Sequence, residues 1–95
     1  MEYTNESVEN LLRNYYSLEN YPSTELYEAK ADLDIALVKL HNYSTNLYNT
    51  LMSVMVNAQP INRVAKQEEV DRKQINRRLH DGLHFLTMIM NGQVL

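Results

Sequence analysis

Apolar side chains recur every three or four residues along most of the chain, which is the spacing of amphipathic helices. The first such run predicts a helix over about residues 6–19, with Asn5 or Ser7 as its N-terminal cap. Pro22 disfavours a helical conformation at the residue before it. We therefore expect the first helix to end just before this proline.

The middle of the chain carries the pattern of two further helices. Leucines seven residues apart predict a helix from Thr24 to about His41. Ser44 then offers a capping hydroxyl, and we expect it to separate this helix from a third one over about 45–56. The seven-residue spacing continues past Ser44, so one unbroken helix over 24–56 is the alternative.

The last third of the chain predicts a short helix, a turn and a long helix. The short helix covers about residues 60–67 and begins with a proline, which suits a first helical turn. Residues 68–70 form the turn, and Asp71 caps a final helix over about 72–91. Gly92 is a typical residue at which such a helix stops.

This pattern and the composition together predict an all-α fold. The 95 residues contain only two glycines and two prolines, and a chain of this length forms one domain with a modest core. We divide it into an extra N-terminal helix with its connection, residues 1–22, and a helix-turn-helix domain with an apolar C-terminal helix extension, residues 23–95.

The charge differs between the two parts of the chain more than the net value of −3 suggests. Residues 1–59 hold three basic side chains and eight carboxylates, a balance of −5. Residues 60–95 hold six basic side chains and four carboxylates, a balance of +2. A local basic face can bind phosphate even when the rest of the molecule is acidic.

The basic residues belong to the predicted helix–turn–helix segment, whose geometry is that of a DNA-reading unit. The small Ala65 lets the long helix approach closely, and Ile75 and Leu79 face inward. The first turns of the long helix then enter the major groove. The expected base-reading side chains are Arg72, Lys73, Gln74, Asn76 and Arg77. The expected phosphate contacts are Arg63, Lys66 and Arg78.

The stretch over about residues 33–86 resembles region four of bacterial RNA polymerase sigma factors and the sigma-like, autolysin-regulator-type regulators of phages. The matching positions are Ile35, Ala36, Leu37, Leu40, Leu47, Leu51, Val64, Ala65, Val70, Ile75, Arg78, Leu79, His80, Gly82, Leu83 and Leu86. Glu69 and Ala58 stand where the family usually has glycine, and the position of Glu69 commonly needs a positive φ. The resemblance implies binding to promoter or operator DNA, contact with RNA polymerase, and a phosphate or partner contact for His80.

The function expected from these features is sequence-specific duplex DNA binding by a transcription regulator of phage or prophage origin. The alternative is a protein-interaction module of the same fold that docks on RNA polymerase or a repressor without binding DNA itself. An accessory protein of DNA packaging or replication is a third possibility, because helix-turn-helix units serve there as well.

The C-terminal helix is apolar on nearly all sides, so part of it needs a partner. Phe85, Met88 and Ile89 lie off the face that serves the core. They either pack on the N-terminal helix that carries Tyr15 and Tyr16 or form the seam of a homodimer.

Other classes of function have weaker support. The chain has no cysteine, and no apolar stretch approaches the roughly 20 residues that span a bilayer. His80 and His84 are spaced like the histidines of zinc proteases. However, Asp81 stands where those proteases have the longer glutamate, and no third ligand is evident. We therefore expect a cytoplasmic protein without metal, cofactor, catalytic site, membrane partner or small-molecule substrate.

Overall fold

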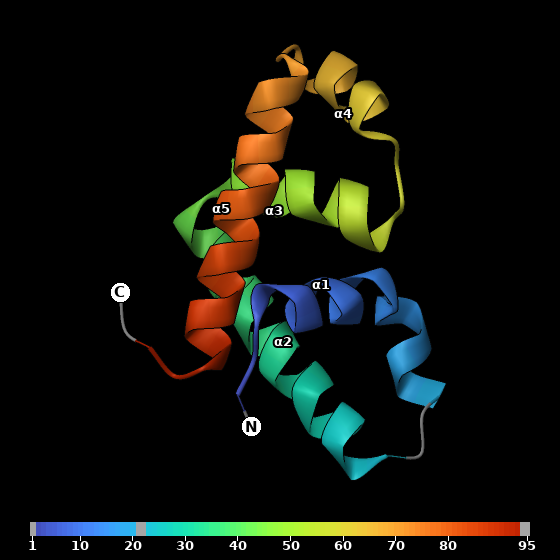
Figure 1. Ribbon diagram of the computed structural model, residues 1–95, viewed down its shortest axis with the longest axis vertical. Coiled ribbons are helices and arrows are strands. Elements are labelled where there is room, and N and C mark those ends of the chain that lie inside the picture. The colour runs from blue at the N-terminus through green and yellow to red at the C-terminus, as the bar shows by residue number, and fades with distance from the viewer. Residues whose placement is uncertain (1, 21–22, 94–95) are drawn as a thin grey trace.

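The computed structural model describes residues 2–20 and 23–93, and every regular element in these ranges is helical (Figure 1). The five α-helices are α1 (Asn5–Arg13), α2 (Thr24–Tyr43), α3 (Thr45–Leu51), α4 (Ile61–Glu68) and α5 (Arg72–Met90). A 3₁₀ helix, η1 (Tyr15–Asn20), follows α1, and a π-helical turn, η2 (Met52–Val56), continues α3. The all-α prediction is confirmed for the described residues.

Helix α5 runs along the molecule and connects its two ends (Figure 1). Helix α4 and the start of α5 form one end, whereas α1 and α2 lie beside the later turns of α5. The largest fully buried side chains come from every α-helix: Val8, Leu12, Leu33, Leu40, Leu51, Val64, Ile75 and Leu86. The N-terminal helix is therefore part of a single shared core.

The first helix is shorter than predicted, and its cap lies one residue earlier. The Thr4 hydroxyl accepts a hydrogen bond from the Ser7 amide at 3.1 Å, and the Ser7 hydroxyl accepts one from the Thr4 amide at 2.9 Å. This is a capping box, in which Ser7 plays the second role rather than the first. The helix ends at Arg13. The Asn14 amide and the Asn14 side chain both bond to the Asn10 carbonyl, at 3.2 Å and 2.8 Å, and η1 follows.

The break at Ser44 is confirmed, and the alternative of one unbroken helix is wrong. Ser44 has an extended backbone, with φ −157° and ψ 108°, and its hydroxyl accepts from the Leu47 amide at 3.2 Å. The third helix keeps its α-helical hydrogen bonding only to Leu51 instead of Val56. Its last turn widens to the π form, which ends where the Asn57 amide bonds to the Met52 carbonyl at 2.9 Å.

The C-terminal third follows the prediction within a residue or so at each boundary. Pro60 precedes α4 with an extended backbone, and Asp71 caps α5 as predicted. Gly92 has φ +78°, and the amides of Gly92 and Gln93 bond to carbonyls in the last turn of α5 at 2.9 Å each. This is the glycine-terminated ending expected from the sequence.

The start of the chain is joined to the end of α5 by a contact that no sequence pattern indicated. The Asn91 side chain accepts from the Tyr3 amide at 2.7 Å and donates to the Tyr3 carbonyl at 2.9 Å. A single side chain thus satisfies both backbone groups of Tyr3.

None of the helices in residues 2–20 and 23–93 has the length and apolarity needed to cross a membrane.

Phe85, proposed from the sequence as part of a dimer seam, is covered within the monomer. Only 8% of it is exposed, and its ring stacks on Tyr43 of α2 with centroids 4.8 Å apart. Met88 and Ile89 are partly exposed. The ring therefore packs on α2 rather than on Tyr15 or Tyr16, because α5 lies directly beside α2 at this level.

Candidate nucleic-acid interface

A small apolar core holds α4 and α5 together at the end of the molecule, in a segment that we call the α4–α5 corner (residues 61–80). Val64 and Ala65 are buried on α4, and Ile75 and Leu79 are buried on α5. Val70, in the connection between them, packs against the same core. Ala65, Ile75 and Leu79 are thus buried as predicted from the sequence, and the opposite faces of both helices are left to solvent.

The connection between α4 and α5 consists of three residues, 69–71, and turns sharply at Glu69. Glu69 has a left-handed backbone, with φ 58° and ψ 39°. The Val70 amide bonds to the Ala65 carbonyl at 3.0 Å, and the Glu69 amide bonds to the Lys66 carbonyl at 3.3 Å. These two bonds form a Schellman motif, which normally has glycine where this chain has glutamate. The positive φ expected at this position is confirmed.

The second half of the connection fixes where α5 begins. The Asp71 carboxylate accepts a hydrogen bond from the Gln74 amide at 2.8 Å. Because this bond stops the helix from fraying, the side chains of its first two turns project in defined directions. All five predicted base-reading residues lie in these turns and are exposed: Arg72, Lys73, Gln74, Asn76 and Arg77.

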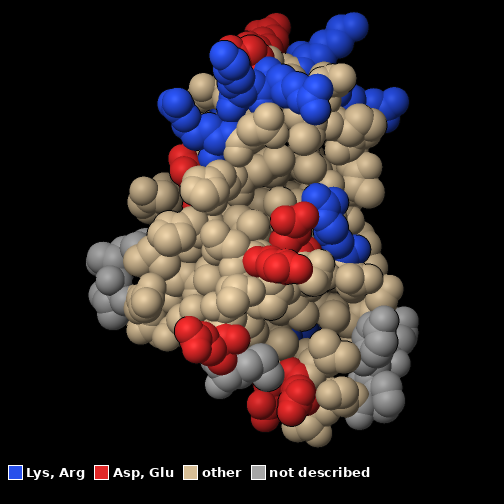
Figure 2. Space-filling view, in the orientation of Figure 1, with Lys and Arg blue, Asp and Glu red and all other residues tan. Residues whose placement is uncertain are grey.

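Three of the four predicted phosphate contacts lie on the exposed surface of the corner. Arg63 and Lys66 are exposed on α4, and His80 is exposed on the third turn of α5. Figure 2 shows Lys and Arg gathered over this end, whereas Asp and Glu predominate at the opposite end of the same face. The charge asymmetry read from the sequence is thus also a spatial separation.

Arg78 is placed differently from the other predicted phosphate contacts. Its side chain is only 14% exposed, because position 78 follows Ile75 by three residues and so faces inward on α5. One guanidinium nitrogen lies 3.4 Å from the Thr50 hydroxyl and 4.0 Å from a Glu68 carboxylate oxygen. Arg78 therefore links α3, α4 and α5 instead of pointing to solvent.

Thr50 is the residue of this region that the sequence reading missed. It is fully buried in α3, and its hydroxyl is the polar contact that α3 offers to Arg78. Its only sequence signal is a hydroxyl next to the apolar Leu51 in a short helix. This signal does not distinguish a buried threonine from an exposed one, and it does not identify Arg78 as the partner of Thr50.

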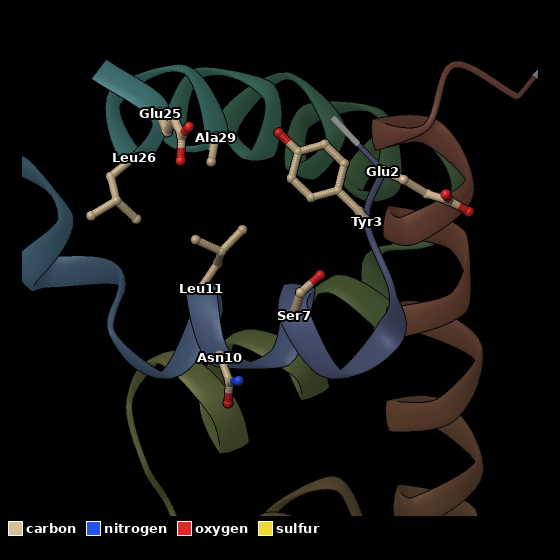
Figure 3. Close-up of a pocket in the computed structure, with 8 residues that line it drawn as sticks. All are labelled: Glu2, Tyr3, Ser7, Asn10, Leu11, Glu25, Leu26 and Ala29. Carbon is tan, nitrogen blue, oxygen red and sulfur yellow. The ribbon is translucent and has the colours of Figure 1, made fainter. Parts of the chain in front are cut away.

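A cavity of about 270 Å³ at the other end of the molecule has a different character (Figure 3). Leu11 from α1 and Leu26 from α2 supply apolar walls, and Glu25 lies at the rim. Its hydroxyl groups are already engaged: Tyr3 donates to Asp32 at 2.9 Å, and Ser7 belongs to the capping box. Among the described lining residues, these contacts leave no free hydroxyl group beside a base.

The histidine pair of the zinc-protease-like spacing lies on the surface. His80 and His84 are both exposed on α5. Within residues 2–20 and 23–93, no three histidine, aspartate or glutamate side chains converge to hold a metal ion.

Comparison of the chain with protein-family models, curated proteins and solved structures gives no match.

Proposed function

We propose that this protein binds duplex DNA through the α4–α5 corner and acts as a sequence-specific transcription regulator, with the start of α5 in the major groove. The observation that carries the proposal is the set of five exposed side chains with base-reading chemistry on the first two turns of a capped helix. The resemblance to sigma region four and to phage sigma-like regulators supports the same function.

The chemistry of these side chains fits the edges of base pairs. Arginine and lysine pair with guanine, and glutamine and asparagine pair with adenine, in the major groove. Helix α5 begins at the tip of the molecule, so its first turns can enter a groove without a clash from α1 or α2 (Figure 1). Arg63 and Lys66 on α4 are then available for the phosphates beside the groove.

The decisive experiment is selection of duplexes from a random pool at moderate salt, followed by fluorescence anisotropy on the selected sequence and on a scrambled duplex. We expect Gln74→Ala to lose about 5- to 150-fold in affinity for the selected duplex and little for the scrambled one. Lys66→Ala should weaken both complexes and reduce the dependence of affinity on salt.

Arg13→Ala is the matched control for charge. Arg13 is exposed on α1 and, among the described residues, forms its ion pair with Glu9 on the same helix at 2.8 Å. Helix α1 lies apart from α4 and the start of α5 (Figure 1). It should bind DNA as the unmodified chain does. Absence of any enriched sequence, or an equal loss in Arg13→Ala and Lys66→Ala, would contradict the proposed interface.

A protein-docking module without DNA binding is the second candidate. The observation that favours it is the pair of carboxylates, Glu68 and Glu69, at the α4 end of the corner, where they repel phosphate. This candidate predicts no measurable affinity for any duplex and a salt-sensitive complex with RNA polymerase or a repressor. The same random-pool selection therefore separates the two candidates.

A further inference from the structure

Helix α2 exposes an apolar stripe that is not covered by any other described part of the monomer. Tyr27, Ile35 and Val38 are 75%, 57% and 62% exposed. Ala31 is exposed between them. The four positions follow one another at four, four and three residues, so they lie along one side of the helix. We call them the α2 stripe.

A stripe of this kind indicates a binding surface. Single exposed apolar residues are ordinary, but a contiguous row along one helix marks a place where another molecule packs. Helix α2 has 20 residues and is therefore about 30 Å long. The stripe covers residues 27–38 of this helix, about 17 Å or three turns, which is enough to pair with a second helix.

Two of the charged residues beside the stripe favour a second copy of α2 as that helix. Glu28 and Lys39 are exposed, and neither has an ion-pair partner within the described residues. They are 11 residues apart, which is three helical turns, so both lie along the same margin of the stripe. They are also equally far from the midpoint of α2, which falls between Leu33 and Asp34.

This symmetry makes Glu28 and Lys39 complementary to each other between two antiparallel copies of α2. When two copies of the helix pair about a two-fold axis through their midpoints, each margin meets the same margin of the other copy. Glu28 of one copy then lies opposite Lys39 of the other, twice per dimer. The small Ala31 lies opposite the segment that carries Ile35 and Val38, which leaves room for their side chains.

We propose that the α2 stripe binds a second copy of this chain through antiparallel α2–α2 packing. The stripe lies on a helix at the other end of the molecule from α4, so the dimer leaves the α4–α5 corner of each copy uncovered (Figure 1). The inference stands independently of the proposed function. It also places the dimer seam on α2 instead of on Phe85, Met88 and Ile89.

The experiment is sedimentation velocity of the full chain over a wide concentration range. One pair of exposed helices is a small interface, so we expect a concentration-dependent monomer–dimer equilibrium. The double variant Ile35→Gln with Val38→Gln should raise the dissociation constant at least tenfold and leave the far-ultraviolet circular dichroism unchanged. Tyr16→Gln, which removes a comparably exposed aromatic side chain outside the stripe, should dimerise normally.

A charge exchange tests the antiparallel register. Lys39→Glu alone places two glutamates opposite one another and should weaken the dimer roughly fivefold. Adding Glu28→Lys restores opposite charges and should restore the dimer to within about twofold, which another partner or register would not produce. A chain that is monomeric at every concentration, or a double exchange as weak as Lys39→Glu alone, would overturn the proposal.

Discussion

The two ends of the molecule differ in whether their polar side chains point to solvent or form internal hydrogen bonds. At the α4–α5 corner, the charged and amide side chains point away from a small apolar core, and Arg78 is the one that turns inward. Around α1 and α2, tyrosines donate to carboxylates: Tyr3 to Asp32 and Tyr15 to Asp34. The corner leaves these hydrogen-bonding groups open, whereas the tyrosine–carboxylate pairs of the other end use theirs internally.

The difference separates groups that are free for a partner from groups that hold the fold. Unpaired side chains on a fixed helix cost little in water and can bind a ligand without first breaking an internal contact. Tyrosine–carboxylate pairs are already satisfied, so they contribute to stability and local rigidity. The corner therefore offers free polar groups to a ligand, and the tyrosine–carboxylate pairs support the fold.

The corner should depend on its small core more than on any of its polar contacts. Leu79→Ala removes a buried leucine between α4 and α5, and we expect a loss of about 2–5 kcal/mol in the free energy of unfolding. Leu79→Met keeps the volume and should cost less than about 1.5 kcal/mol. Urea denaturation measures both, and a Leu79→Ala variant of normal stability would show that the corner is held in some other way.

The protein should lose stability at high pH because of two tyrosines around α1 and α2. Burial, and then the hydrogen bond to Asp32, raises the pKa of Tyr3 to about 12. The hydrogen bond to Asp34, together with burial, raises the pKa of Tyr15 to about 12. Since the folded state holds these protons more tightly than the unfolded state, their contribution is complete below pH 10 and is lost as the pH rises towards 12.

Urea denaturation at pH 9 and pH 11 measures this loss, which should amount to roughly 1–3 kcal/mol. Tyr3→Phe removes one of the two titrating groups, so its stability should fall less over the same interval. Tyr16→Phe, at an exposed tyrosine, is the control and should follow the unmodified chain. Identical pH profiles for all three proteins would refute the structural role of the Tyr3–Asp32 pair.

The smallest effect is expected in the turn of the corner. Glu69 adopts φ 58°, a left-handed conformation that is unfavourable for a residue with a side chain. Glu69→Gly should therefore stabilise the protein by about 0.5–1 kcal/mol. The neighbouring change Glu68→Gly, within α4, should destabilise it by a similar amount or more. Thermal unfolding of the two variants should give melting temperatures shifted in opposite directions.

Local signals predicted the corner well because each one acts over a few residues. Asp71 as a cap, the inward Ile75 and Leu79, and Gly92 as a stop depend on the hydrogen bonds and spacing of neighbouring positions. The break at Ser44 is of the same kind. The five base-reading candidates are exposed because the periodicity of α5 places them away from its buried face.

Where the structure differs from the sequence-based predictions, the reason is a contact that the spacing of apolar residues does not encode. The spacing of Arg78 from Ile75 indicates its inward face, but its partner Thr50, 28 residues earlier, has no signature in the sequence. At the early end of α1, the Asn14 side chain bonds to the Asn10 carbonyl beside the Asn14 amide, and the spacing of apolar residues does not indicate such a local bond. Phe85 stacks on Tyr43 because of how α2 and α5 meet, which helical periodicity does not specify.

The long reach of α5 has a consequence for cutting the chain. The loop between η2 and α4 includes the exposed residues Asn57, Ala58 and Pro60, and a break there gives an N-terminal fragment without α5 and a C-terminal fragment without α1–α3. Neither fragment contains a closed core, since α5 packs on α2 and α3 as well as on α4. Folding would then become a bimolecular association, which makes this loop the natural site for a split reporter built from the protein.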